Sequence, residues 1–474
     1  MPTRHAEVRA PRYKTRWMDR EEENAKNMLS RRGFIQVGAA TVGSLALRPF
    51  GLLPALAQSG GDYRALVCVF LFGGNDSNNT VIPMDDVNYQ AYTSIRGSLG
   101  LSGSDLTSQV TSVSGAPYAF HAKLAEVASL FSSKELAVVA NVGSLVQPLT
   151  RAQYQSQQMP IPLNLFSHSD QQLQWQTALA QGHSPTGWAG RAADYIAGAG
   201  FNTGSFPVFL SVAGNALEGT GVQTQPAAIT PGQALGLAGF KGTAASDARL
   251  SALKSLLTTD TGVSLVQAAN NTMANGISDA KTLEAALAKA TPLKTQFPTT
   301  DIGAQLAQVA QIIQVQASLG MRRQIFFCSL GGFDTHANEL ATHNNLYPQL
   351  SPALAAFYDA TQELGVAQNV TTFTESDFSR TFQPTTDDGS DHAWGSHHLV
   401  LGGAVQGGQI FGKFPTFQLA GPDDADVRGR WIPTTSIDQY GATLCSWFGI
   451  PDTALATVFP NFPNFGSVKL GFLG

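Results

Sequence analysis

The chain has 474 residues, of which 43% are hydrophobic and 13% charged, and its net charge at pH 7 is −5. This length can bury a large core, and the composition excludes a wholly disordered chain. The negative charge argues against nucleic acids and anionic membranes as partners, although a local metal site or an arginine could still bind a small anionic ester.

The first 57 residues carry a positive charge of their own. They hold ten Lys/Arg and five Asp/Glu, which leaves 19 and 29 of these residues, a net charge of −10, for the rest of the chain. The stretch SRRGFIQ at residues 30–36, the Gly/Ala-rich apolar run after it and the Ala-Leu-Ala at residues 55–57 are typical of a twin-arginine export signal with its cleavage site. Arg48 and Pro49 break the run, which is shorter than the ~20 apolar residues of a membrane span.

This N-terminal pattern predicts the domain organisation and the location of the protein. Residues 1–57 are expected to be a signal peptide with a basic leader, and residues 58–474 a single domain. The twin-arginine export machinery is then a partner, and the mature protein would be in the bacterial periplasm or outside the cell, with no stable membrane span after cleavage.

Six apolar runs of strand length recur along the remainder of the chain. Continuous apolar runs separated by segments of helical period are typical of parallel strands covered on both faces. The predicted fold is therefore α/β, a doubly wound, mainly parallel sheet with helices on both faces. The runs are residues 66–71, 136–140, 208–212, 325–329, 370–374 and 399–401.

Helical period appears in four further segments. Residues 246–290 are expected to form helices broken near residues 258–262 and at Gly276, and residues 302–319 another. A helix should follow the loop GGFDTHANE, and one should begin at Ser436, a candidate N-cap. Three cysteines, two of them inside apolar runs, predict buried thiols and no disulfide framework.

Polar residues follow several of the expected strands, where open α/β sheets bind ligands. Asp76 follows the first strand and is either a ligand of a hard cation or part of a turn. Asp334 and His336 follow the fourth strand and can share a divalent cation, although Asp334 could also cap the next helix. These residues are typical of one metal site built from separate loops.

The loop after the fifth strand adds two carboxylates, Glu375 and Asp377, and an arginine. Either carboxylate could bind metal, while Arg380 could hold an anionic substrate or form a salt bridge with Asp377.

The stretch DHAWGSHH, which precedes the last apolar run, contributes Asp391, His392 and one of His397 and His398. Converging loops would give enough oxygen and nitrogen ligands for one or two divalent ions, zinc, manganese, magnesium or calcium.

The segment FSHSDQQ contains a serine and a histidine at an expected helix start. A serine there lies among free backbone N–H groups that stabilise a transferring anion, and His168 beside it could act as base or ligand. Ser167 is either a helix cap or a nucleophile. A metal-free esterase using only these two residues is disfavoured because adjacent side chains diverge on a helix.

Together, SRRGFIQ, FLFGGNDSNNTVIP, FSHSDQQ, GGFDTHAN, ESDFSRT and DHAWGSHHLVLGG resemble the bacterial family known as the domain of unknown function 1501, over residues 62–470. Members of that family look like distant relatives of the alkaline phosphatase and sulfatase superfamily. The resemblance implies an alkaline-phosphatase-like fold, one or two divalent metals at strand ends, and transfer of phosphoryl or sulfuryl groups. No cysteine lies in a sulfatase-type motif.

The resemblance also implies roles for single residues. Asp76 would be the metal ligand after the first strand and Ser167 the nucleophile. Asp334 and His336 would bind one metal, although they are two residues apart where the superfamily has four. The later ligands would be Asp391, His392 and His398. The expected function is an exported, metal-dependent hydrolase of phosphate or sulfate esters, and the alternative is a catalytically inactive secreted or envelope-associated binding protein.

Overall fold

The structure, a computed structural model, describes residues 62–235, 237, 242–259 and 262–473. The expected export signal and basic leader, residues 1–57, lie outside the described residues. In the part of the chain that is described, we find no helix with the length and apolar character needed to cross a membrane.

A nine-stranded sheet forms the centre of the described residues, in the order β11-β5-β10-β9-β1-β8-β6-β7, with β12 also paired to β5. All six apolar runs form strands of this sheet, as predicted. The strands are β1 (Arg64–Leu71), β5 (Leu136–Gly143), β6 (Phe209–Ser211), β7 (Ala227–Ala228), β8 (Arg323–Leu330), β9 (Val370–Ser376), β10 (Ser396–Leu401), β11 (Ile410–Gly412) and β12 (Thr435–Ser436).

The sheet is mainly parallel, as the continuous apolar runs predicted. β1 pairs in parallel with β8 and β9, and β6 with β7 and β8. β10 is the exception, because it pairs antiparallel with both β9 and β5. The beginning of β10 therefore lies at the edge where β1, β8 and β9 end, which we call the carboxyl edge.

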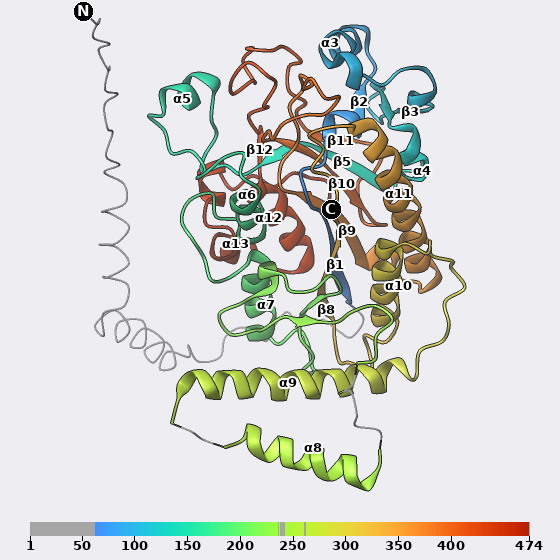
Figure 1. The fold of residues 1–474 in the computed structure, drawn as a ribbon, viewed down its shortest axis with the longest axis vertical. Helices are drawn as coiled ribbons and strands as arrows, with labels where there is room; N and C mark the ends of the chain where they lie inside the picture. Colours follow the sequence, from blue (N-terminus) through green and yellow to red (C-terminus); the bar gives the residue numbers. More distant parts are fainter. Residues whose placement is uncertain (1–61, 236, 238–241, 260–261, 474) are drawn as a thin grey trace, which may run out of the picture. The chain divides into compact units, whose positions relative to one another are not determined.

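Helices cover both faces of the sheet, which confirms the predicted doubly wound arrangement (Figure 1). One group contains α4, α10 and α11, and the other contains α6, α7, α12 and α13; within each group neighbouring helices contact one another. The helices of these two groups are α4 (Ala125–Ser132), α6 (His168–Thr177), α7 (Trp188–Gly198), α10 (Asp301–Gln314), α11 (Glu339–Glu363), α12 (Ile437–Phe448) and α13 (Asp452–Val458).

The expected helix boundaries are mostly confirmed. α11 follows the GGFDTHANE loop, and Ser436 caps α12 in a capping box with Gln439. The break near residues 258–262 separates α8 (Ala244–Leu257) from α9 (Ser264–Leu287). The second expected break was wrong, because α9 continues through Gly276; a single glycine costs a helix only about 1 kcal/mol.

A small antiparallel sheet, β2 (Val81–Pro83), β4 (Pro117–Phe120) and β3 (Ser108–Thr111), lies beside α3 (Asp86–Arg96). In Figure 1 these elements lie at the opposite end of the main sheet from α8 and α9. The short elements are α5 (Arg151–Ser156), η1 (Ser77–Asn79), η2 (Gly97–Leu99), η3 (Gly103–Leu106), η4 (Ala122–Leu124), η5 (Leu217–Gly219), η6 (Ala367–Asn369) and η7 (Phe462–Phe465).

The core is built around β1, whose residues from Ala65 to Phe70 have no exposed surface. All three cysteines, Cys68, Cys328 and Cys445, are buried and free, as expected. A strand buried on both faces fixes the end from which its loop emerges, so the central strands hold the loops of the carboxyl edge in place.

Candidate metal centre

Four separate segments bring polar side chains to the carboxyl edge. Asp334 follows β8, Asp377 follows β9, and His392 precedes β10. His168 is the first residue of α6, a helix that contacts β9. The antiparallel direction of β10 is what allows a loop before a strand to meet loops after strands.

Asp334 is the common neighbour of three histidines. Its Oδ1 lies 3.1 Å from His336 Nε2, 3.3 Å from His168 Nε2 and 3.6 Å from His392 Nε2. The Nε2 atoms of His336 and His392 lie 2.9 Å apart. We call these four residues, His168, Asp334, His336 and His392, the candidate metal centre.

Hydrogen bonds at the far side of two imidazoles fix their orientation. His392 Nδ1 lies 2.6 Å from the Phe166 carbonyl oxygen, which can only accept, so Nδ1 carries the proton. His168 Nδ1 lies 2.7 Å from Asp377 Oδ2. In both rings the Nε2 atom is left to face Asp334, which is the arrangement of histidines that bind metals.

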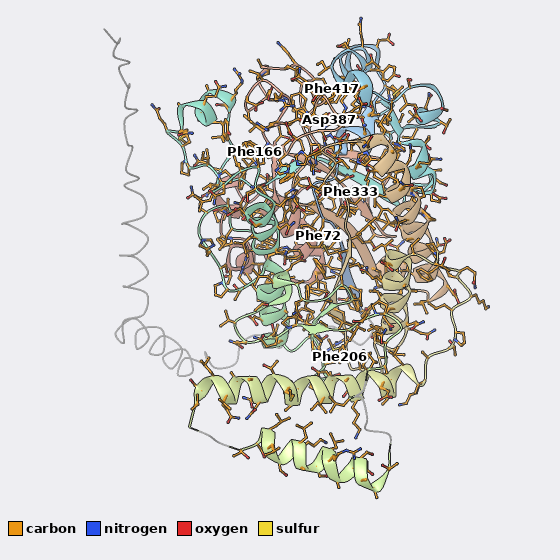
Figure 2. All side chains as sticks on the ribbon, viewed as in Figure 1. Phe72, Phe166, Phe206, Phe333, Asp387 and Phe417 are labelled. Carbon is orange, nitrogen blue, oxygen red and sulfur yellow. The ribbon has the colours of Figure 1, made fainter. Side chains whose placement is uncertain are left out.

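The backbone at Phe166 has a positive φ of 71°, which is unusual for a bulky residue. The Arg430 guanidinium carbon lies 4.6 Å from the centre of the Phe166 ring, and the Phe166 carbonyl oxygen accepts the hydrogen bond from His392 Nδ1. Figure 2 labels Phe166 in the upper half of the molecule, as it does Phe333, the residue before Asp334. These contacts hold Phe166 in a strained conformation of the kind found at functional sites.

Asp377 is buried and has three hydrogen-bond donors. Besides His168, it accepts bonds from the Gln172 side chain at 2.7 Å and from the backbone N–H of Gly73 at 3.1 Å. Gly73 has a φ of 110°, and a Cβ there would lie 2.5 Å from the backbone nitrogen of Asp334, so only glycine lets the two loops approach. Asp377 was predicted as a direct metal ligand; the structure places it behind His168, as the residue that orients the imidazole.

Asp391 lies on the outer side of His336. Its Oδ1 is 3.3 Å from His336 Nδ1, and its other oxygen accepts a hydrogen bond from Arg428. Asp391 was also predicted as a ligand, and the structure gives it the same position relative to His336 that Asp377 has relative to His168.

The candidate metal centre has the dimensions of a metal site. One ligand atom from each of His168, Asp334 and His392 lies within 4.8 Å of the others. Ligand atoms of a tetrahedral zinc site, with bonds of about 2.0 to 2.2 Å, are about 3.3 to 3.6 Å apart. The distances of 3.3 and 3.6 Å from Asp334 to His168 and His392 match this spacing. Two imidazoles and a carboxylate form a donor set suited to zinc or manganese.

Local charges set the pKa values of these side chains. Partial burial lowers the pKa of His392, so its imidazole is neutral at pH 7 and available as a ligand. Partial burial raises the pKa of Asp334, but the hydrogen bond and charge of Arg380 outweigh this, and the pKa lies below its usual value. The hydrogen bond to Asp377 raises the pKa of His168.

Arg380 neither faces a substrate nor pairs with Asp377, the two roles that the sequence suggested. Its guanidinium is buried and donates to Asp334 Oδ1 at 2.6 Å and to the carbonyl oxygens of Gly74 at 3.0 Å and Ser390 at 3.2 Å. It therefore pairs with Asp334 rather than with Asp377, and its donors are used within the protein instead of facing a substrate.

Two predicted ligands lie away from the candidate metal centre. Asp76 is fully buried and binds the Arg96 guanidinium, which also pairs with Glu339 at 3.1 Å. The glycine pair before Asp76 turns the chain so that this carboxylate points to α3. The structure thus corrects the placement of Asp76 as a ligand after the first strand.

His398 lies in the interior, with its ring 4.7 Å from Trp175 and 5.8 Å from Tyr440. His397 is also buried, and its Nδ1 accepts a hydrogen bond from the Asn141 backbone. Both belong to β10, a strand buried on both faces, so neither histidine reaches the loops. The placement of His398 as a ligand is corrected for this reason.

Ser167 is the N-cap residue of α6 but makes no capping hydrogen bond with its side chain. Its Oγ lies 2.6 Å from Asp170 Oδ2 and 3.2 Å from Ser169 Oγ. Ser167 is partly exposed.

Some residues of the site were not found from the sequence. Gln172 could have been, because it lies four residues after His168 on the same helix face. Phe166 could not have been found, because a strained backbone leaves no local sequence pattern. Arg428 could not have been found either, because it lies 37 residues from its partner Asp391.

The hydrogen bond between His168 and Asp377 allows a prediction about the pKa of His168 in the metal-free protein. The Asp377→Asn variant should lower the pKa of His168, because it removes the negative charge that stabilises the imidazolium. The contribution of this pair to stability is fully present below the unfolded pKa of about 6.5 and is lost as the pH rises through the higher folded pKa. NMR titration of the imidazole C–H signals measures the pKa, and an unchanged value in the variant would contradict the assigned hydrogen bond.

The fold and the site together define an α/β protein with a histidine–carboxylate cluster at the carboxyl edge of a mainly parallel sheet. The chain belongs to the family described as "Protein of unknown function (DUF1501)", whose model matches residues 63–428. This confirms the family resemblance of the motifs. No match was found among curated proteins.

Several solved structures share a distant likeness. Ps i-CgsB in complex with k-i-k-neocarrahexaose has a TM-score of 0.33 and 8% identity, covering 85% of this chain and 77% of that one. A Bacteroides thetaiotaomicron protein, BT33494S-sulf, has a TM-score of 0.34, 10% identity and coverage of 83% and 74%. The phosphonate monoester hydrolase of Agrobacterium radiobacter has a TM-score of 0.28, 10% identity and coverage of 82% and 74%. Scores this low carry no argument about activity.

Proposed function

We propose that the protein is a metal-dependent hydrolase of small anionic esters, of the phosphate or sulfate class. The observation that supports this most is the candidate metal centre itself. His168, Asp334 and His392 present ligand atoms within 4.8 Å of one another, with the imidazole of His392 held by the Phe166 carbonyl and that of His168 by Asp377.

One or two divalent ions bound there would polarise the ester and stabilise the developing negative charge. Within the chain, His168, Asp334 and His392 would hold the ion. Phe378 has no exposed surface, and its ring lies 4.8 Å from the rings of both His168 and His392, so it excludes water beneath them. Because Phe378 covers the inner side of the candidate metal centre, a substrate would bind on its outer side.

Ser167 is the proposed nucleophile because it directly precedes His168 in the chain, at the start of α6. Asp170 accepts the hydrogen bond from this hydroxyl at 2.6 Å and orients it. That bond lowers the pKa of Asp170, so the carboxyl is ionised at pH 7 and available as an acceptor. The helix N-terminus adds free backbone N–H groups that favour an anionic group.

Hydrolysis of aryl phosphate and aryl sulfate esters by the metal-loaded full chain tests this function. We expect activity that a chelator removes and that His392→Ala abolishes. His183→Ala, an exposed histidine outside the candidate metal centre, serves as the control and should keep full activity. Tight metal binding without hydrolysis of either ester class would contradict the hydrolase and favour a binding protein.

Ser167→Ala should lower the rate by roughly 10³-fold or more if Ser167 is the nucleophile, because the group that forms the covalent bond is lost. Ser169→Ala is the matched control, since Ser169 is exposed, lies two residues further along the helix and contacts the same Asp170 at 3.5 Å. Steady-state rates with both variants decide the assignment. Equal rates in Ser167→Ala and the parent chain would place the nucleophile elsewhere.

We also propose export to the periplasm or beyond by the twin-arginine machinery, on the basis of SRRGFIQ at residues 30–36. Changing both Arg31 and Arg32 to lysine should keep the chain in the cytoplasm with its N-terminal segment uncleaved. Cell fractionation followed by mass measurement of the chain tests this, and unchanged export would contradict it.

A further inference from the structure

A second group of metal-ligating side chains lies inside the core, separate from the candidate metal centre. Cys68 on β1, Glu218 on η5 and Glu375 on β9 each place one ligand atom within 4.8 Å of the other two. Cys68 and Glu218 have no exposed surface, and Glu375 has 1%. The three residues come from elements far apart in the sequence, so the fold itself assembles them.

The pairing of β1 with β9 explains why two of these side chains meet. Cys68 lies opposite Phe373, and Phe70 lies opposite Glu375. Because side chains alternate along a strand, Cys68 and Glu375 point to the same face of the sheet. Glu218 reaches this face from η5, whose backbone is held by a hydrogen bond from the Glu218 N–H to Gln176 at 3.2 Å.

Three carboxylate oxygens of this group have no hydrogen-bond partner, although the indole of Trp188 also faces Glu375. Both carboxylate oxygens of Glu218 and Oε2 of Glu375 have no hydrogen bond, and in the described ranges neither residue forms an ion pair. Burying such groups without compensation costs several kcal/mol. By contrast, the buried carboxylates of Asp76 and Glu339 share Arg96.

We propose that Cys68, Glu218 and Glu375 bind a transition-metal ion of the zinc type. A thiolate with two carboxylates suits zinc, whereas magnesium and calcium take oxygen ligands. Ligand atoms around such an ion are about 3.3 to 3.8 Å apart. Small rotations of the glutamate side chains would bring the three ligand atoms to these distances. The ion would neutralise the buried carboxylates and tie η5 to β1 and β9.

Metal binding at this site requires loss of protons. Burial raises the pKa of Glu218 to about 8, so at pH 7 the metal-free carboxyl carries a proton that the ion displaces.

Cobalt substitution of the full chain tests the site independently of the candidate metal centre. The candidate metal centre has only nitrogen and oxygen ligands, so a near-ultraviolet thiolate-to-cobalt charge-transfer band reports only on a site with a cysteine. The protein is stripped with a chelator, reloaded with Co²⁺ under a phosphine reductant, and measured by absorption. We expect the band in the parent chain and in His392→Ala, and its loss in Cys68→Ser.

Cys328→Ser is the matched control, because Cys328 is buried and free but outside the group, and it should keep the band. If Cys68→Ser does not fold, Glu218→Gln decides, with loss of one metal equivalent expected. Absence of the band in the parent chain, its retention in Cys68→Ser, or full metal content in Glu218→Gln would overturn the proposal. Failure of ester hydrolysis with the band intact would instead concern only the proposed function.

Discussion

Replacing Asp334 by asparagine is expected to weaken metal binding by about 100-fold or more, because an amide is a poorer ligand and carries no charge. Asp334 Oδ1 lies within 3.6 Å of the Nε2 atoms of all three histidines, so the change removes the atom that they share. Its side chain is 52% exposed, and the amide oxygen of asparagine can still accept the hydrogen bond from Arg380. Competition titration of zinc against a chromophoric chelator measures the affinity.

Asp387→Asn is the matched control, since Asp387 is an exposed acidic residue in the loop before Asp391 (labelled in Figure 2) and is not part of the candidate metal centre. It removes the same charge and should bind zinc as the parent chain does. If Asp334→Asn bound zinc as tightly as Asp387→Asn, Asp334 would not be a ligand.

The second large effect is on stability. Arg96→Met should lower the free energy of unfolding by about 3–5 kcal/mol, because it leaves two buried carboxylates without their cation. Arg96 bonds Asp76 and Glu339 and also donates to the carbonyl oxygens of Thr381 at 3.1 Å and Phe382 at 3.2 Å. Urea unfolding of both chains measures the difference.

The pH dependence of this effect has a defined sign. Burial raises the pKa of Asp76 to about 7, partly offset by Arg96. A carboxyl whose folded pKa is raised favours folding most below its unfolded pKa of about 3.9, and this contribution is lost as the pH rises through 7. Without Arg96 the carboxylate is disfavoured further, so the destabilisation should be larger above pH 7 than in acid.

Lys469→Met is the control for Arg96→Met. Lys469 pairs with Asp452 at 2.7 Å, but both side chains are solvent-accessible, so its loss should cost less than about 1 kcal/mol. A cost for Arg96→Met no larger than that for Lys469→Met would show that the buried network contributes little.

The strands could be predicted because strands buried on both faces of a sheet consist of continuous apolar runs. The direction of β10 could not be predicted, since a six-residue strand carries no signal of its orientation. Its start was also expected too late: the apolar run was assigned from Leu399, whereas the strand begins at Ser396. That difference of three residues moved His397 and His398 from the expected loop into the core.

The candidate site was predictable where polar residues lie in the loops next to predicted strands, and it was not predictable where a residue distant in the sequence pairs with the side chain. Asp334 and His392 were found because their loops meet at the carboxyl edge. Asp76 follows the same pattern, but Arg96, twenty residues later, and Glu339 on α11 draw its carboxylate into a separate network. Local sequence cannot show which buried cation a carboxylate will meet.

The most direct test of the candidate metal centre is an anomalous-difference map from crystals of the full chain grown with zinc and measured at the zinc edge. We expect a peak about 2.0 to 2.2 Å from His168 Nε2, His392 Nε2 and a carboxylate oxygen of Asp334. A zinc-loaded crystal with no peak between these three side chains would contradict it.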